Sequence, residues 1–409
     1  MKRKHRPKDA REALETPARI EPARLEEPPE AVADLLAELA GQSATLGKAL
    51  HPRTAANLAA LMRVMNTYYS NLIEGHNTRP RDIERALAGD LDADEERRNL
   101  QLEAAAHVRV QAEIDARAAA GGLGEPAALA FIKWLHGECY RGAPAAMLTV
   151  SGAGRSFVMQ QGAWRSKPGH DNVVGRHVPP SSGRVEAFMA YFAERYGFGK
   201  LGKAARILAI PAADHRFNYI HPFPDGNGRV SRLMSHAMCH AAGIGAHGLW
   251  SVSRGLARGL AEGPEGRAEY KRMMDRADTP RQGDLDGRGN LSLKALTEFT
   301  VWFLTACLDQ VAFMSGLFEI NTLDRRLHAY VAQNERLKLE TARLLSEALV
   351  RGEFERGAAA RITGLPERSA RRVLNDAIGA GLLGSDSPKG AVSLRFPAAA
   401  LEVLFPRLF

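Results

Sequence analysis

Apolar residues recur at three- and four-residue spacing through most of residues 31–327, as at Leu58 and Leu61. This period is typical of amphipathic helices that bury one face. Residues 1–32 differ, because they are rich in charge and proline and carry few large apolar side chains, so we expect a disordered tail. The pattern predicts a mainly α protein with two helical parts, an N-terminal set of helices and a core, over 33–146 and 147–327.

One stretch interrupts the helical period. From Met147 to Pro180 glycines are frequent, and the apolar residues around Val150 and Phe157 alternate with polar ones. Alternation of this kind predicts a short β-hairpin. Pro179 and Pro180 close the stretch, and a new helix is expected to begin near residue 183 or 184. Irregular inserts in a helical domain often carry function.

The chain after residue 337 has another order of elements. It predicts two helices, a turn at Gly364, a third helix, a polar Gly/Pro loop and a strand, over 337–350, 357–362, 366–379, 384–390 and 392–396. Pro366 suits the first turn of its helix. This order is that of a winged helix-turn-helix domain, which we expect over 337–409.

The candidate recognition helix of this domain carries Arg368, Arg371 and Arg372. Because residues three and four apart share a helix face, these side chains could meet a DNA backbone. Winged helices also serve dimerisation and the docking of protein partners, so both alternatives stay open.

Composition narrows the class of protein. Apolar residues make up 45% of the chain, enough for a sizeable core, and the formal charge of +8 favours an acidic partner such as nucleic acid or a phosphorylated ligand. The three cysteines lie far apart, which predicts free thiols in a reducing, cytoplasmic compartment.

Nothing in the sequence predicts a membrane protein. The basic N-terminus has no apolar stretch after it, so no secretory signal is expected. The longest apolar run, over 301–314, is interrupted by Asp309 and Gln310 and is too short to span a bilayer.

The segment from His221 to Arg232 reads His-Pro-Phe-Pro-Asp-Gly-Asn-Gly-Arg-Val-Ser-Arg. Gly226 and Gly228 permit backbone conformations that let successive N–H groups face one anion. Helical spacing resumes after Gly228, so the loop is expected to end at a helix N-terminus, which also favours anions.

The charged residues of this loop indicate a polyphosphate ligand. Arg229 and Arg232 share one face of the first helical turn and suit more than one phosphate group. Asp225 would be an acid inside a positive site, where its simplest role is to hold Mg²⁺. His221 can accept a proton from an attacking hydroxyl near neutral pH.

This segment resembles the motif of the Fic family, His-x-Phe-x-Asp/Glu-Gly-Asn-Gly-Arg-x-x-Arg, at every defined position. The resemblance extends over roughly residues 31–327 and implies a Fic-type helical core that transfers AMP from ATP to a Ser, Thr or Tyr hydroxyl of a protein. It implies His221 as the base, Phe223 as the apolar anchor of the loop and Asp225 as the Mg²⁺ ligand. The remaining loop residues would bind the phosphates of ATP, with Arg232 at the γ-phosphate: Gly226, Asn227, Gly228, Arg229 and Arg232.

The insert also resembles a family element, the flap that borders the site. Val174, Gly175, Arg176 and His177 match it within a flap expected over 162–180, and Gly162-Ala-Trp-Arg165 resembles its lead-in. An extended flap can pair with a target segment as an added strand. Tyr270 and Asp278 lie where the family lines the adenine pocket, although the family has a second tyrosine and an asparagine where this chain has Lys271 and Asp278.

Residues 70–75 match the inhibitory pattern Ser/Thr-x-x-x-Glu-Gly/Asn of regulated Fic proteins, through Ser70, Glu74 and Gly75. A carboxylate that pairs with Arg232 would remove the partner of the γ-phosphate. The alternative is a solvated glutamate followed by a C-capping glycine.

The sequence thus predicts an autoinhibited protein adenylyltransferase that uses ATP and Mg²⁺. The alternatives are a nucleotide-sensing DNA-binding regulator, a de-AMPylating Fic enzyme and a Fic enzyme that moves another phosphate-containing group. Expected partners are a target protein docked on the flap, the chain itself through self-modification or homodimerisation, and DNA, but no membrane. The helical spacing of His236, Cys239 and His240 could hold a metal, yet without a fourth ligand beyond His247 a packed helix is favoured.

Overall fold

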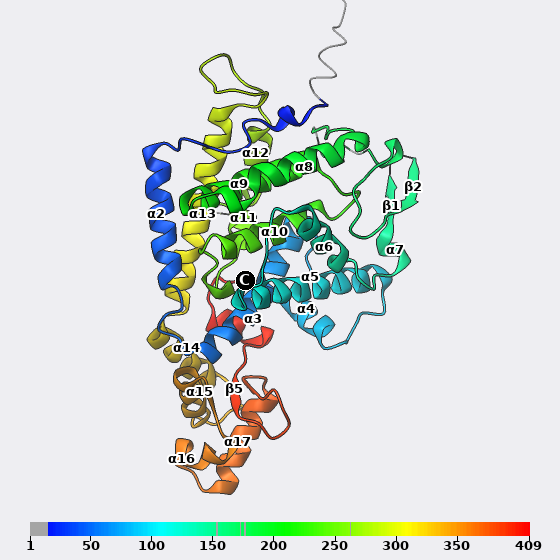
Figure 1. Ribbon diagram of the computed structural model, residues 1–409. Helices are drawn as coiled ribbons and strands as arrows, with labels where there is room; N and C mark the ends of the chain where they lie inside the picture. Colours follow the sequence, from blue (N-terminus) through cyan, green and yellow to red (C-terminus); the bar gives the residue numbers. More distant parts are fainter. Residues whose placement is uncertain (1–14, 153, 172, 176, 262) are drawn as a thin grey trace, which may run out of the picture.

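The computed structural model describes residues 15–409 apart from 153, 172, 176 and 262, so Arg176 lies outside the described residues. Within them the fold is mainly helical, with a small antiparallel hairpin and a small C-terminal sheet (Figure 1). This agrees with the predicted mainly α class. One apolar core joins the central helices to the C-terminal elements.

The described N-terminal part is not a free tail. A 3₁₀ turn, η1 (Pro17–Ile20), precedes α2, and Ile20, Ala23 and Leu25 are buried. The buried Arg216 donates hydrogen bonds from Nε to the Ile20 carbonyl and from Nη2 to the Pro22 carbonyl. The prediction of disorder over 1–32 is therefore wrong for residues 15–32. It failed because the few apolar residues that anchor this segment have no periodicity that would predict a helix or strand.

The described helices before the hairpin lie on different sides of the molecule (Figure 1). They are α2 (Glu30–Thr45), α3 (Pro52–Ile73), α4 (Pro80–Leu87), α5 (Glu95–Ala119), α6 (Leu129–Cys139) and α7 (Ala145–Leu148). Helix α3 buries Leu58, Met62, Met65 and Tyr69, which recur every three or four residues on one face. It packs against α5 and α11 (Val252–Arg258), and it ends at Ile73, just before Glu74, which pairs with Arg232.

The central helices are α8 (Val185–Tyr196), α9 (Lys203–Ile220), α10 (Asn227–Ala241), α11 (Val252–Arg258), α12 (Gly263–Ala277) and α13 (Leu293–Leu317). Helices α9 and α10 pack on each other and are joined by residues 221–226. In α10, Val230, Leu233, Met234 and Ala237 are fully buried. The packing therefore fixes the direction of the helix that begins at the loop.

Helix α13 corrects the expectation that no segment could span a membrane. It has 25 residues and is long and apolar enough to do so by length and composition alone. However, 56% of its most apolar window is buried within the fold. It lies alongside α2 and also packs on α9, α11 and α12 (Figure 1).

The irregular insert holds a hairpin earlier than the predicted flap. Strands β1 (Thr149–Gly152) and β2 (Arg155–Val158) pair antiparallel, with Thr149 opposite Val158. Residues 162–180 contain a 3₁₀ turn, η2 (Pro168–His170), and an isolated bridge between Val174 and His177. The next helical residues are η3 (Ser182–Arg184) and then α8, close to the predicted start.

The C-terminal elements lie near their predicted positions. They are α14 (Ile320–Gln333), α15 (Thr341–Arg351), α16 (Ala359–Thr363), α17 (Glu367–Gly379), α18 (Leu401–Leu404) and the strands β3 (Glu353–Phe354), β4 (Leu383–Gly384) and β5 (Val392–Leu394). The strands form one antiparallel sheet in the order β3-β5-β4. Helix α14 runs through residue 327, where the predicted core ends.

The end of the chain returns to the helical body and lies against α3 (Figure 1). The Tyr69 hydroxyl donates to the Leu408 carbonyl at 2.9 Å, and Tyr68 packs edge-on against Phe409. At the other end of α3, the Thr54 hydroxyl donates to the Leu349 carbonyl. Helix α3 therefore contacts the C-terminal elements, and the residue after it, Glu74, pairs with Arg232 of α10.

Candidate active site

The loop between α9 and α10 turns through the left-handed region at both ends. His221 ends α9 with φ 51°, and its N–H donates to the Phe217 carbonyl. Gly226 has φ 77° and caps α10 without a side chain. A Cβ at position 226 would lie 2.8 Å from the Tyr140 hydroxyl, so only glycine fits there. Gly226 has no side chain that could cap α10. The first N–H groups of α10 are therefore suited to bind an anion.

An apolar anchor and an amide clamp hold the loop in place. The Phe223 ring is fully buried and stacks on His136, with ring centroids 3.9 Å apart. The Asn227 side chain accepts from the Phe223 N–H at 2.9 Å and donates to its carbonyl at 2.8 Å. The side chain of Asn227 is therefore committed to the loop itself.

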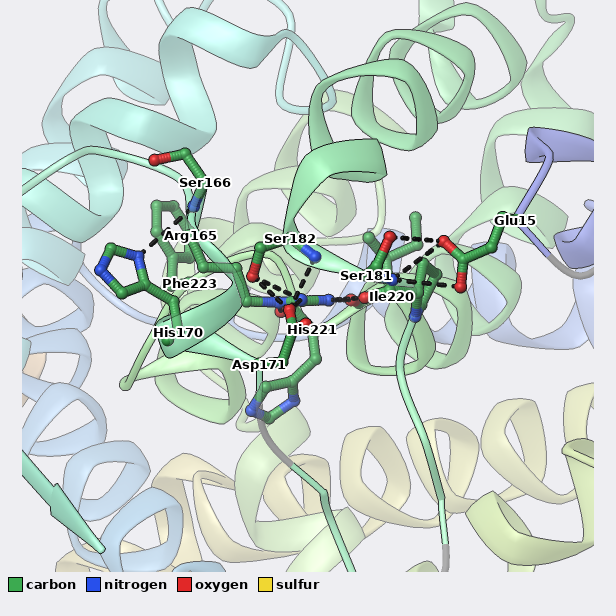
Figure 2. Close-up of polar contacts among 12 residues, drawn as sticks. Glu15, Arg165, Ser166, His170, Asp171, Ser181, Ser182, Ile220, His221 and Phe223 are labelled. Carbon is green, nitrogen blue, oxygen red and sulfur yellow. Dashed lines mark hydrogen bonds and ion pairs between the residues drawn. The ribbon is translucent and has the colours of Figure 1, made fainter. Parts of the chain in front are cut away.

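Arg165 fixes the backbone from which the His221 imidazole projects. Its Nε donates to the His221 carbonyl at 2.7 Å, and its Nη2 donates to the Ile220 carbonyl at 3.0 Å. Its Nη1 meets Asp171 and Ser182, each at 3.1 Å (Figure 2). Because Arg165 is buried, these bonds join the segment around residue 180 rigidly to the end of α9.

Asp225 and Arg229 share one phenol. Tyr140 donates to Asp225 Oδ2 at 2.7 Å and accepts from Arg229 Nη2 at 2.6 Å. Arg229 also pairs with Glu103 of α5, with Nη1 and Oε2 3.3 Å apart. Burial alone would raise the pKa of Asp225, but the charge of Arg229 and the Tyr140 hydrogen bond outweigh it and lower the pKa.

Arg232 is held by residues at the end of α3. Its Nη2 lies 2.6 Å from Glu74 Oε1, and its Nε donates to the Ser70 hydroxyl at 2.9 Å. Burial would raise the pKa of Glu74, but the charge and hydrogen bond of Arg232 lower it. A Cβ at Gly228 would lie 2.2 Å from Glu74 Oε1, so glycine is required for this approach.

Gly75 at the same time ends α3 in the way expected for a capping glycine. It has φ 92°, its N–H donates to the Leu72 carbonyl, and the next N–H, of His76, donates to the Asn71 carbonyl. This is the Schellman pattern. The capping part of the alternative is therefore correct, but Glu74 is paired with Arg232 and is not simply solvated.

The imidazole of His221 is set for its neutral form. Desolvation by burial, followed by the positive charges of Arg165 and His177, lowers its pKa to about 4. A neutral imidazole can accept a proton at pH 7.

The flap and adenine-side residues lie together in part. Asp278 contacts two histidines. Its Oδ2 lies 3.2 Å from His177 Nδ1, and its Oδ1 lies 3.0 Å from His215 Nε2. His177 is thereby tied to the residue that follows α12 as well as to Val174, its bridge partner. Tyr270 is buried, and its hydroxyl donates to Asp214 at 2.8 Å, so its phenol is engaged in the core.

The structure does not bring every predicted residue to this place. Arg368, Arg371 and Arg372 are exposed on α17, far from the loop at the other end of the molecule (Figure 1). Conversely, no sequence motif indicated that Tyr140 and Glu103 contact residues of the loop. Tyr140 stands 89 residues before Arg229, and no spacing rule links such positions.

The described residues form a mainly helical, Fic-like fold. Residues 128–239 match the sequence model of the Fic/DOC family, a segment that contains the loop and the insert but not residues 70–75.

Known relatives match over a short stretch. The chain is 34% identical over 70 residues to the protein adenylyltransferase Fic of Aedes aegypti, and 38% identical over 71 residues to that of Drosophila ananassae. Each match covers 17% of this chain and only 14% of the relative. A crystal structure of a Fic family protein from Desulfovibrio desulfuricans G20 aligns with a TM-score of 0.51 at 18% identity, over 90% of this chain and 98% of that chain. At this identity the likeness shows the fold alone.

Proposed function

We propose that the protein is an adenylyltransferase that moves AMP from ATP to a hydroxyl group of a protein. The observation that carries the proposal is the loop itself, where His221, whose pKa burial lowers, precedes a helix N-terminus with two buried arginines, Arg229 and Arg232. This combination fits a polyphosphate and an attacking hydroxyl.

In the proposed reaction the acceptor oxygen attacks the α-phosphorus of ATP. The new oxygen–phosphorus bond forms as the bond to the bridging oxygen breaks, and pyrophosphate leaves. His221 takes the hydroxyl proton. Positioning and charge neutralisation by Arg229, Arg232 and the N–H groups of α10 supply most of the rate enhancement.

The residues present fit Mg²⁺. The Asp225 side chain is 56% exposed, and its Oδ2 is the oxygen that Tyr140 and Arg229 contact. The carboxylate therefore has room to bind a cation while Tyr140 fixes its orientation. Bound there, Mg²⁺ would neutralise charge on the phosphate oxygens.

We further propose that Glu74 inhibits the site. Its carboxylate lies 2.6 Å from Arg232 and reaches the space beside Gly228. A γ-phosphate that binds Arg232 must displace it. The Glu74 side chain is 39% exposed, so such displacement does not require opening the core.

The test uses ATP labelled at the α-phosphate, with Mg²⁺ and cell lysate. We expect Glu74→Gly to label itself or a lysate protein more strongly than the wild type, and Glu74→Gly combined with His221→Ala to lose the label by about 10²–10⁴-fold. His76→Ala, an exposed neighbour of Glu74, serves as the matched control and should behave as the wild type.

Two results would favour another function. If no variant transfers label while all bind ATP, the adenylyltransferase proposal fails and a nucleotide sensor or another donor explains the loop better. If Glu74→Gly instead removes label from a pre-labelled target, the de-AMPylating alternative gains the support.

As a second function, we propose that residues 337–409 form a winged helix that binds DNA. The supporting observation is that Arg368, Arg371 and Arg372 are exposed on α17, whereas its apolar face, with Val373 and Leu374, is buried. Three guanidinium groups on one exposed face suit a phosphate backbone. Duplex binding measured by fluorescence anisotropy tests this; no binding at low salt, or equal binding by a variant with all three arginines changed to alanine, contradicts it.

A further inference from the structure

Three side chains from two helices converge behind the loop. Asp115 lies on α5, and His236 and His240 lie one turn apart on α10. Asp115 Oδ1 is 2.7 Å from His236 Nε2 and 3.1 Å from His240 Nε2, and the two nitrogens are 3.2 Å apart. All three side chains are largely enclosed, with exposed fractions of 12%, 5% and 9%.

We propose that Asp115, His236 and His240 bind a divalent transition-metal ion, for which Zn²⁺ is the best match. Zinc bonds to imidazole nitrogen and carboxylate oxygen are about 2.0–2.1 Å long, which places tetrahedral ligand atoms about 3.3 Å apart. The two separations that involve His240 Nε2, 3.1 and 3.2 Å, are close to that value, whereas the 2.7 Å between Asp115 Oδ1 and His236 Nε2 would have to lengthen. Two histidines at i and i+4 on one helix face are a common zinc-binding arrangement.

The neighbouring residues orient this ligand set. Arg63 of α3 donates to Asp115 Oδ2 at 2.9 Å, which leaves Oδ1 to face the two imidazoles. A partner that fixes the second carboxylate oxygen is typical of metal sites, where it sets ligand direction. The donors are imidazole and carboxylate, a set that suits zinc and its first-row neighbours better than calcium.

The proposed site also has access to solvent. His240 lines a surface cavity of about 370 Å³ together with Ala118, Glu125 and Phe198. An ion held by three protein ligands keeps a coordination position for water, which this cavity can supply.

Sequence spacing alone pointed to a different set of ligands. Cys239 is buried in the core, where burial raises its pKa, and it is not part of the group. The third ligand is Asp115, 121 residues before His236, which no local pattern connects with α10.

A metal here would join the C-terminal turns of α10 and α5. Helix α10 carries Arg229, and α5 carries its partner Glu103. The ion would therefore strengthen the support of the loop without contacting the reacting groups. The inference is independent of the proposed reaction, because metal binding is measured without any turnover.

The experiment uses the full chain, freed of metal with a chelator and titrated with Co²⁺ and then Zn²⁺. We expect one Co²⁺ per chain with visible d–d absorption, displacement of Co²⁺ by Zn²⁺, and a Zn²⁺-dependent rise in Tm. His240→Ala should bind Zn²⁺ about 100-fold more weakly or worse. His76→Ala, which changes an exposed histidine outside the group, is the control and should bind like the wild type.

Circular dichroism of each variant separates ligand loss from misfolding, and His240→Gln replaces His240→Ala if the latter does not fold. The proposal is overturned if the wild type shows neither Co²⁺ absorption nor a Zn²⁺-dependent Tm. It is equally overturned if a folded His240 variant binds Zn²⁺ as tightly as the wild type, because the cluster is then only a hydrogen-bonded Asp–His–His network.

Discussion

Two arginine-bearing regions of this molecule differ in what surrounds the charge. In the loop, Arg229 and Arg232 have side chains only 7% and 2% exposed, and each is already paired with a carboxylate. On α17, Arg368, Arg371 and Arg372 are exposed. A buried guanidinium must have its partners built in, because an unpaired buried charge is costly, whereas an exposed one is hydrated.

Because of this difference, changes in the loop and changes on α17 should affect different properties. A ligand that enters the loop has to exchange with partners that the protein already supplies, so binding there competes with Glu74 and is coupled to the fold. A ligand that meets α17 displaces only water and counterions. Changes in the loop should therefore alter stability and respond to pH, and changes on α17 should alter binding and respond to salt.

The largest effect is expected for Arg229→Met. Removing this cation leaves Glu103 and Asp225 without their charge partner, and breaking a buried pair in this way costs about 3–5 kcal/mol. Arg371→Met, at an exposed position of α17, should stay within about 0.5 kcal/mol of the wild type. Urea unfolding of both variants measures the difference. Equal losses at the two sites would remove the distinction between the regions.

Next in size is the effect of Tyr140→Phe on metal-dependent nucleotide binding. The phenol hydroxyl bridges Asp225 and Arg229, so its loss frees the proposed Mg²⁺ ligand to rotate. Loss of such a supporting hydrogen bond lowers metal affinity about 10–100-fold. The measurement is Mg²⁺ titration of ATP binding by calorimetry in the Glu74→Gly background. Tyr330→Phe, in the C-terminal part, is the control; an unchanged Mg²⁺ requirement in Tyr140→Phe would argue against Asp225 as the ligand.

Sequence spacing predicted the parts of the site that are local. The glycines and the helix start after Gly228 follow from a loop that joins two helices, and residue periodicity locates such loops. The role of Phe223 came from the resemblance to the Fic motif. Glu74 and its helix were found because a short pattern names them. The order of elements in residues 337–409 was likewise readable from turns and apolar period.

The parts that sequence missed depend on contacts between distant segments. Tyr140, Glu103 and Asp115 act on α10 from other helices, and nothing in their own surroundings marks them. The tail before α2 was misjudged for the same reason, since Ile20 and Leu25 are buried by helices more than a hundred residues later. The hairpin is not among the missed parts, because the alternation around Val150 and Phe157 predicted it and residues 149–158 pair as β1 and β2.

A smaller effect, on the pH dependence of stability, is expected for Asp278→Asn. Two histidines hold the Asp278 pKa below its usual range, although burial opposes them. A lowered carboxyl pKa stabilises the fold above the unfolded value of about 3.9, and this contribution is lost as pH falls below it. We expect the variant to be about 1.5 kcal/mol less stable at pH 7 and the difference to shrink toward pH 3. Urea unfolding between pH 3 and 7 tests this; a gap that does not change with pH would mean that the ionised form is not what stabilises.

The smallest effect is expected on α17, where a single exposed charge is removed. If Arg371 contacts a phosphate of duplex DNA, Arg371→Ala should weaken binding a few-fold whatever the base sequence, and reduce the slope of log K against log salt by about one. Anisotropy titrations at several salt concentrations give that slope. Arg351→Ala, an exposed arginine on α15 paired with Glu347, is the control and should leave the slope unchanged. A slope that falls equally in both variants would mean that net charge, and not the α17 face, attracts the DNA, and the contrast between an enclosed loop and an open binding helix would then hold for stability alone.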